Sequence, residues 1–413
     1  MIREATTEGM AVNSLERILE PCRAEEFLAS FWGKTYKHIR GWPGKFARLL
    51  PWHELNEILR RHRLDFPRLR LMRDGQRVPV NTFIRRATNA RTGSSIPRLL
   101  PAELTRHLRE GATLVLDAVD ELSRPIEELA EALELVLHEH IQVNMYAGWQ
   151  TSRGFDLHWD DHDVFILQVT GRKLWRIYGE TRKHPVTGDV MEKPDQGGDA
   201  PLWEAMLEDG DLLYIPRGWW HVAMPLAEPT LHLTVGVHNR TGLDLLRFVA
   251  ESLRERSALF RQDLPRFAST EERRAHMSRL LDEFLKTWGE ASVDAFLQEY
   301  DEQAIARAHL SLPWSATAGI LPGNTSRARV RFLAPRPLDI NVEEGALEFS
   351  CMGKRWRFKA EAALVLKPLN EKRNCSVSEL VEAARGKLDE QLVRTFLAEL
   401  ISLGLVQAIE EEI

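Results

Sequence analysis

Cysteine is scarce in this chain of 413 residues, which has only three, and their positions follow no pairing pattern. A disulfide framework is therefore not expected, and we predict a reducing, cytoplasmic setting. The N-terminal stretch carries charges throughout and lacks an apolar segment, so it does not resemble a signal peptide. The longest apolar runs fall short of the ~20 residues that a membrane helix needs, which predicts a chain without membrane spans.

A large excess of one charge is also missing. The net charge is −6, and 28% charged and 44% hydrophobic residues are typical of an ordinary globular protein. This balance does not favour general nucleic-acid affinity, although it leaves local basic patches open. Tryptophan, by contrast, is frequent, with twelve residues. Such a number suits a fold with broad apolar faces or a lined pocket.

The length allows two or three domains, and the residue patterns divide the chain into four parts. Residues 1–64 read as a helical part that packs on a barrel, with helices over 24–39 and from Pro51 onward. Residues 65–240 contain short β-rich segments separated by Gly and Pro, the pattern of an antiparallel barrel or jelly roll. Residues 241–310 return to helices, which either mediate dimerisation or pack on their own domain.

The fourth part, residues 325–413, follows a Pro/Gly-rich stretch at 311–326. We interpret "ARVRFL", "LEFSCMGKRWRFK" and "AALVLKPLN" as strands, followed by two helices and an edge, which is a winged-helix outline. Winged helices often bind DNA. The helices here carry acidic faces, so we expect a protein-contact or structural role and no direct DNA binding. The whole chain is predicted to be an α+β protein.

The stretch "FDLHWDDHDVFILQVTGRKLWRIYGE" carries the most chemistry. In an extended strand His158 and Asp160 would project from the same face into a barrel. Imidazole and carboxylate ligands together suit a divalent metal, and a second histidine would complete a 2-His-1-carboxylate site for Fe(II). His221 in "GDLLYIPRGWWHVAM" is the best third ligand, because a turn and a strand present it. The alternative is a polar loop whose side chains are solvated.

Other histidines compete with this assignment. His162 has the same strand parity as His158, so it is the rival ligand, although we expect it at the rim of the pocket. His232 suits a core position or a supporting position beside the site. His184 and His238 fit loops or strand ends.

A hairpin at Thr170-Gly171 places Lys173 at the start of the next strand. There its ammonium group either points into the barrel, where it would pair with a carboxylate of a dicarboxylic cosubstrate, or lies on the surface.

Two motifs carry a resemblance to a known family. "HWDDHDVFILQVTGRKLWR" and "GDLLYIPRGWWH" together resemble the JmjC/cupin-type Fe(II)- and 2-oxoglutarate-dependent oxygenases, and among them the ribosomal oxygenases of the cupin-4 branch, which hydroxylate ribosomal proteins. The motifs cover about 140 to 240, and the order of the four parts fits the whole chain. The resemblance implies a double-stranded β-helix, that is, a jelly-roll or cupin core.

The resemblance also implies a role for particular residues. His158, Asp160 and His221 would bind Fe(II), and Lys173 would bind the distal carboxylate of 2-oxoglutarate. Further pocket positions follow on neighbouring strands, at Asn144, Tyr146 and Thr234. Two features depart from the family pattern. Gly236 stands where ribosomal members carry a serine on the substrate side, and the loop before His158 reads "AGWQTSRGFDL" where family members often carry prolines.

The expected function is hydroxylation of a protein residue, with a ribosomal histidine or arginine as the example, using 2-oxoglutarate and O2 and releasing succinate and CO2. Two alternatives remain. The chain would instead oxidise a small molecule or a peptide precursor, or it would be a non-catalytic cupin that acts through interactions. Lysine demethylation is a variant of the first function, because it uses the same iron chemistry. We expect a homodimer formed through residues 241–310.

Overall fold

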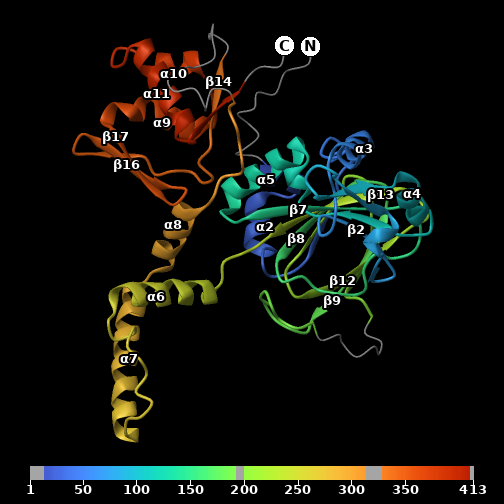
Figure 1. The fold of residues 1–413 in the computed structure, drawn as a ribbon, viewed down its shortest axis with the longest axis horizontal. Helices are drawn as coiled ribbons and strands as arrows, with labels where there is room; N and C mark the ends of the chain where they lie inside the picture. Colours follow the sequence, from blue (N-terminus) through green and yellow to red (C-terminus); the bar gives the residue numbers. More distant parts are fainter. Residues whose placement is uncertain (1–13, 192–199, 313–327, 410–413) are drawn as a thin grey trace. The chain divides into compact units, whose positions relative to one another are not determined.

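The architecture comes from a computed structural model that describes residues 14–191, 200–312 and 328–409 (Figure 1). The chain divides into two compact units at Asn239–Arg240, and each unit has its own hydrophobic core. The four-part division predicted from the sequence is finer than this, and its inner boundaries stay predictions. Most of the predicted Pro/Gly-rich linker lies outside the described residues. Among those residues, no helix has the length and apolar character to cross a membrane.

The first unit contains two antiparallel sheets, so the predicted jelly-roll core is confirmed (Figure 1). The larger sheet has the order β1-β11-β8-β13-β7-β6-β2-β3. Its strands are β1 (Lys37–Ile39), β2 (Leu69–Arg73), β3 (Gln76–Arg77), β6 (Thr113–Leu116), β7 (Ile141–Gly148), β8 (Asp163–Thr170), β11 (Leu212–Ile215) and β13 (Thr230–Val237). The smaller sheet has the order β10-β9-β12, with bounds β9 (Lys173–Glu180), β10 (Trp203–Leu207) and β12 (Trp219–Pro225). A separate hairpin joins β4 (Ile84–Thr88) to β5 (Ser95–Leu99).

Side chains alternate in direction along the strands, so that one set forms an outer core and the other set faces a lumen between the two sheets. On β8, Phe165 and Leu167 belong to the large outer core. Their neighbour Ile166 packs instead with Trp175 and Ile177 of the smaller sheet. Successive strand residues point to opposite faces, so the even-numbered residues of β7, β8 and β13 face this lumen.

Helices of the first unit contribute buried side chains to the same core as the larger sheet. They are α1 (Ser14–Leu19), α2 (Ala24–Ser30), α3 (Trp52–Arg61), α4 (Pro101–Arg109) and α5 (Arg124–Leu137). Helix α5 packs on β7 and α1, and it buries Ile126, Ala130 and Leu133 completely.

One predicted helix is shorter than expected. The stretch 24–39 is not a single helix, because α2 ends at Ser30 and β1 follows it. Gly33 adopts a φ of 63°, which is the left-handed conformation that often follows a helix C-terminus. The chain then pairs with β11 along Lys37–Ile39. Sheet pairing, which helical spacing does not report, decides the structure of this segment.

The second unit begins with α6 (Gly242–Arg256), α7 (Thr270–Glu290) and α8 (Val293–Gln303). Thr241 and Ser269 cap the first two of these helices through reciprocal hydrogen bonds with Asp244 and Glu272. A winged-helix-like domain follows. Its elements are β14 (Arg329–Phe332), β18 (Asn374–Ser376) and β19 (Val406–Ile409), with α9 (Ala363–Lys372), α10 (Val377–Ala383) and α11 (Glu390–Ser402). A small sheet of β15 (Asn341–Glu343), β16 (Ala346–Cys351) and β17 (Lys354–Lys359) precedes these helices.

The prediction of a strand over "AALVLKPLN" is wrong, because this segment forms most of α9. Val365, Leu366 and Leu369 are all fully buried, and their spacing of one and four residues places them on one helical face. A short apolar run does not distinguish a buried strand from a buried helix. Pro368 inside the helix added to the misleading pattern.

Candidate metal centre

Two histidines from distant segments meet through their backbones. His158 precedes β8 and His221 lies in β12, and an isolated antiparallel bridge joins them. The N–H of His221 donates to the carbonyl of His158 at 2.8 Å, and the reverse bond measures 3.2 Å. The ring centroids lie 4.4 Å apart. Backbone hydrogen bonding therefore holds positions 158 and 221 side by side, whichever side chains these positions carry.

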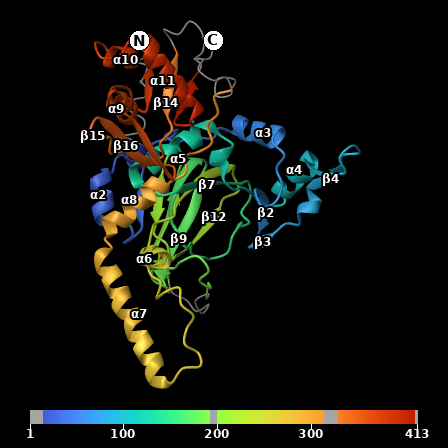
Figure 2. The same cartoon turned by 60° about the vertical axis from the view of Figure 1, so that its left-hand side comes forward.

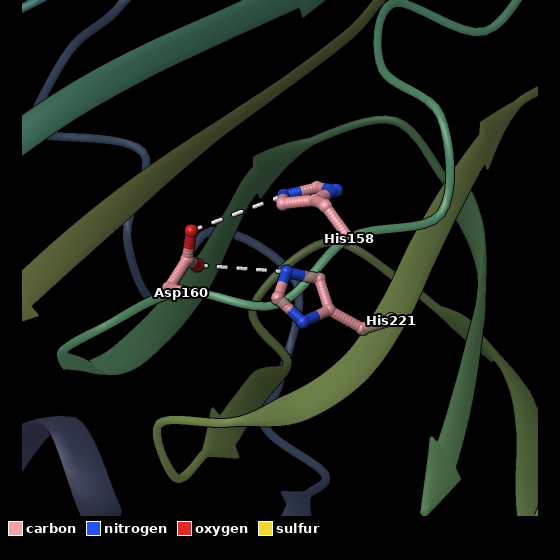
Figure 3. Close-up of side chains that lie close together, drawn as sticks. All are labelled: His158, Asp160 and His221. Atoms are coloured by element: carbon pink, nitrogen blue, oxygen red, sulfur yellow. Dashed lines mark ion pairs between the residues drawn. The ribbon is translucent and has the colours of Figure 1, made fainter. Parts of the chain in front are cut away.

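Asp160 completes a group of three side chains that point toward one another (Figure 3). Its carboxylate oxygens lie 4.0 Å from Nε2 of His158 and 3.5 Å from Nε2 of His221. One ligand atom from each residue lies within 4.8 Å of the others. Metal bonds to His and Asp are about 2.1 Å long, so both measured separations are short enough for one ion to contact both atoms. The three residues thus fit a divalent metal.

Local hydrogen bonds orient the two rings. Nδ1 of His158 lies 2.8 Å from the carbonyl of Asp156, and Nδ1 of His221 lies 2.9 Å from the carbonyl of Trp219. A carbonyl oxygen only accepts hydrogen bonds, so each Nδ1 carries the proton. Each Nε2 then presents its lone pair toward Asp160, which is the tautomer that a metal ligand requires.

The charges of the group also suit a metal. Burial lowers the pKa of His221 to about 4. Burial raises the pKa of Asp160, but the imidazoles of His221 and His158 outweigh this effect and hold that pKa below its usual range. At neutral pH the group therefore offers a neutral imidazole and an ionised carboxylate, the forms that bind metals. His158 is 30% exposed and His221 4%, so the group opens to solvent on the side of His158.

The strand parity used for this segment does not hold throughout it. The regular strand begins only at Asp163, and the chain bends at residues 161–162. Strand parity therefore cannot place His162, which is absent from the group of three. Its Nδ1 lies 3.0 Å from Oδ1 of Asp161, and its ring stacks on His238 at 4.5 Å.

The serine-to-glycine departure at 236 has a structural counterpart. A Cβ placed on Gly236 would lie 2.8 Å from Cδ2 of His162, closer than carbon atoms approach in folded proteins. Gly236 therefore leaves room for the imidazole of His162 beside the lumen.

We expect Gly236→Ser to lower the free energy of unfolding by about 1–3 kcal/mol, because overpacking forces neighbouring side chains to shift. Urea unfolding of the variant checks the value. In a His162→Ala background the same substitution should cost less than half as much, since the ring that it meets is gone. Equal losses in both backgrounds would show that His162 is not the residue displaced.

Lys173 lies in the lumen and not on the surface. The residue is 3% exposed, and Nζ lies 2.9 Å from Nδ1 of His232. It forms no ion pair with any described residue. Burial lowers the pKa of Lys173 to about 7, and burial with the nearby Lys173 charge lowers the pKa of His232 well below its usual value. Burying an ammonium group without a counter-ion is costly, so an anion bound beside Lys173 would stabilise its charged form.

The remaining predicted pocket residues line the same lumen. The ring of Tyr146 stacks on His232 at 5.0 Å, and burial raises the pKa of its hydroxyl. Asn144 and Thr234 are paired across β7 and β13. Oδ1 of Asn144 accepts hydrogen bonds from the backbone N–H of Ala118 and from Nε2 of Gln142. That oxygen therefore supports the fold.

Sequence reasoning missed two residues that shape the site. Trp175 shares the strand parity of Lys173, is 4% exposed, and has an Nε1 without a hydrogen-bond partner among the described residues. Asp163 is almost completely buried, and its carboxylate accepts from the hydroxyl of Tyr214 at 2.6 Å and from the N–H of Arg217 at 3.0 Å. This carboxylate fixes the turn that leads to His221. Parity along "KLWRIYG" would have found Trp175, whereas no local pattern marks Asp163.

Comparison with known proteins agrees with the fold and the motifs. Residues 121–245 match the JmjC domain family. Matching curated relatives carry the name bifunctional lysine-specific demethylase and histidyl-hydroxylase NO66. The protein from Drosophila sechellia is 29% identical over 264 residues, which is 60% of this chain and 38% of that protein. The one from Drosophila persimilis is 25% identical over 322 residues, 73% of this chain and 44% of its own length. The chain thus spans less than half of these curated relatives.

Solved structures resemble nearly the whole chain. The Escherichia coli ribosomal oxygenase YcfD is 16% identical, with a TM-score of 0.54 over 94% of this chain and 98% of YcfD. Its complex with cobalt and 2-oxoglutarate gives a TM-score of 0.53 at 17% identity. At such identity the similarity shows the fold alone.

Proposed function

We propose that this chain, whose residues 121–245 match the JmjC domain family, is an Fe(II)- and 2-oxoglutarate-dependent oxygenase that hydroxylates a residue of a protein. One observation carries the proposal. The lumen of the jelly roll contains both a three-residue group that fits a metal and a buried ammonium group that has no counter-ion among the described residues. A metal alone would need only the first, and a dicarboxylate cosubstrate accounts for the second.

In this proposal His158, Asp160 and His221 hold Fe(II) on one side and leave its other positions open. With 2-oxoglutarate and O2, the bound iron supplies the oxidising chemistry that inserts an oxygen atom into a C–H bond, with succinate and CO2 as coproducts. The protein residues orient the groups around it. The carbonyls of Asp156 and Trp219 fix the rings of the two histidines, so the ligands do not rotate when substrate exchanges.

Lys173 is the residue that we propose for the distal carboxylate of 2-oxoglutarate. Its Nζ donates to Nδ1 of His232, which fixes the direction of the ammonium group and leaves further N–H donors for a carboxylate. Nε1 of Trp175 is a second donor on the same strand face without a partner among the described residues. Tyr146, Asn144 and Thr234 would form the walls beside the cosubstrate and the substrate.

A protein substrate is favoured by the comparisons. The relatives named NO66 are histidyl-hydroxylases and lysine-specific demethylases by name, and YcfD is named a ribosomal oxygenase. We propose a ribosomal protein as the substrate class, with histidine or arginine as the residue, and lysine demethylation as the second candidate. Oxidation of a small molecule or peptide precursor, and a non-catalytic role, are the alternatives that an assay must separate.

The test is hydroxylation of ribosomal proteins. The enzyme with Fe(II), 2-oxoglutarate and ascorbate is incubated with the separated proteins of the ribosome of its own source, and intact masses are compared with and without enzyme. A gain of one oxygen atom on one protein, absent with His221→Ala, is the expected result. Loss of a methyl group would indicate the demethylase. Cosubstrate turnover with no modified protein would reject the protein substrate and favour a small molecule.

We also propose a homodimer formed through the helical segment. Helix α7 exposes apolar side chains along one face, namely Met277, Leu281, Leu285 and Trp288, each more than 40% exposed. Their spacing of three or four residues forms a continuous stripe, and such a stripe marks an interaction surface. We include a cytoplasmic location in this proposal, because the cytoplasm contains the proposed ribosomal substrate.

A further inference from the structure

Arginine is concentrated in one stretch of the first unit. Between residues 60 and 98 the sequence has eleven arginines and no lysine, against two aspartates, in a chain whose net charge is −6. A guanidinium group binds phosphate through two parallel N–H bonds, which an ammonium group cannot do. The exclusive use of arginine therefore points to phosphate and not merely to solubility.

Ion pairs within the fold account for only part of this charge. Six of the arginines pair with Glu57, Asp65, Glu110, Asp117 or Glu121. The other five are exposed and form no ion pair with any described residue. They are Arg63, Arg77, Arg85, Arg91 and Arg98. Internal carboxylates thus leave several guanidinium groups free for an external anion.

The hairpin of β4 and β5 brings two of these free arginines together. Arg85 lies directly opposite Arg98 in the register of the two strands, and like charges in this position destabilise a hairpin. Figure 2 shows β4 extending outward beside α4. Local features that oppose stability are expected where a protein binds something.

A hollow beside the hairpin adds an aromatic surface. Its volume is about 770 Å³, and Phe66, Arg77, Arg85 and Arg86 are among its lining residues. Phe66 is 47% exposed, and the guanidinium carbon of Arg77 lies 4.4 Å from the centre of its ring. An exposed aromatic ring next to cations is the platform on which an unpaired base stacks. The volume lies within the range of about 300–1,000 Å³ that is usual for ligand sites.

We infer that this arginine surface, defined as Phe66, Arg77, Arg85, Arg91 and Arg98, binds single-stranded RNA. The arginines contact successive phosphates, and Phe66 stacks on a base. A duplex supplies phosphates but hides the faces of its bases, and an acidic peptide supplies carboxylates but no base. The choice of RNA over DNA rests on the proposed function, because a ribosomal substrate is surrounded by RNA.

The experiment measures fluorescence anisotropy of a labelled single-stranded 12-nucleotide RNA with the full chain, without iron or 2-oxoglutarate. We expect Arg85→Glu/Arg98→Glu to weaken binding at least tenfold. This variant replaces one like-charge pair by another, so the electrostatic repulsion within the hairpin is unchanged. Arg85→Glu alone turns the pair into an attractive one, and it should weaken binding while stabilising the hairpin. Phe66→Ala should weaken binding about fivefold or more.

A matched control separates the effect of the arginine surface on RNA binding from the effect of overall charge. Arg17→Glu/Lys183→Glu changes the net charge by the same amount at two exposed residues elsewhere in the first unit, and it should alter binding less than twofold. Each phosphate contact contributes about −0.7 to the slope of log affinity against log salt concentration. Reversing the charges of Arg85 and Arg98 removes two phosphate contacts, so the magnitude of this slope should decrease by about 1.4.

Several results would overturn the inference. The control variant could weaken binding as much as Arg85→Glu/Arg98→Glu does, or Phe66→Ala could have no effect. The protein could also bind duplex RNA or polyglutamate more tightly than the single strand, or bind single-stranded DNA of the same sequence with equal affinity. Because the assay needs no turnover, its failure is distinguishable from failure of the proposed oxygenase. Hydroxylation without RNA binding would reject only the arginine surface.

Discussion

Replacing Asp160 or His221 by alanine should reduce succinate formation from 2-oxoglutarate to below about 1% of the parent rate. Loss of a residue that only supports a metal ligand already lowers metal affinity or activity 10–100-fold, so loss of a ligand itself should exceed that range. The three ligand atoms lie within 4.8 Å of one another, and none of the three has a substitute in the group. Calorimetric titration with Co(II) under anaerobic conditions should show a corresponding loss of metal affinity.

The fold should survive these substitutions. The contact between His158 and His221 uses backbone N–H and carbonyl groups, which alanine retains. Thermal unfolding of the metal-free variants should therefore stay close to that of the metal-free parent. His184→Asn is the matched control, because His184 is an exposed histidine outside the group, and it should keep full turnover. Parent-level turnover by Asp160→Ala would refute the metal site.

The requirement for 2-oxoglutarate should increase as the pH rises above about 7. Burial lowers the pKa of Lys173 from 10.5 to about 7, so the free enzyme loses the lysine charge above that pH. A carboxylate binds the protonated form, and the KM for 2-oxoglutarate should rise up to about tenfold per pH unit until the pKa of the complex is reached. The measurement is the KM for 2-oxoglutarate at intervals from pH 6 to pH 9.

Two variants separate the charge of Lys173 from its shape. Lys173→Arg keeps a positive charge at every pH of the series. The KM of this variant for 2-oxoglutarate should therefore not increase with pH, although the altered geometry will change its absolute value. Lys173→Met removes the charge-assisted hydrogen bond and should raise the KM at least tenfold at pH 7. A rise of the same slope in Lys173→Arg would assign the pH dependence to another group.

The same lysine should lower stability in the absence of cosubstrate. Its pKa is lowered on folding, so the folded protein binds this proton less readily than the unfolded chain. Stability is then highest above the unfolded pKa of 10.5 and falls as the pH decreases toward about 7. Lys173→Met should consequently be more stable than the parent at pH 7 without 2-oxoglutarate, a gain in stability at the expense of function.

Sequence patterns predicted the jelly roll because alternation and turn residues are local properties. They left Lys173 open between the lumen and the surface, and only the structure shows that it is buried. The same parity rule could not be applied to His162, because the chain bends just before Asp163 and regular alternation begins only there. It also could not decide between strand and helix for the apolar run that became α9.

The meeting of His158 with His221 was a different kind of prediction. It rested on the resemblance and on motif chemistry, because no local rule connects residues so far apart in sequence. The structure adds what the sequence did not contain, namely the buried Asp163 that holds the turn before His221 and the unpartnered Nε1 of Trp175. Both depend on which strands become neighbours, and neighbouring strands are a property of the complete fold.

The orientation of the two imidazoles has a consequence for protein engineering. Each ring is fixed by a carbonyl only two residues earlier in its own segment, Asp156 for His158 and Trp219 for His221. Each half of the pair is therefore a self-contained module of three residues. Grafted onto two facing strands of an unrelated antiparallel sheet, the modules should recreate a chelating histidine pair that needs only one added carboxylate.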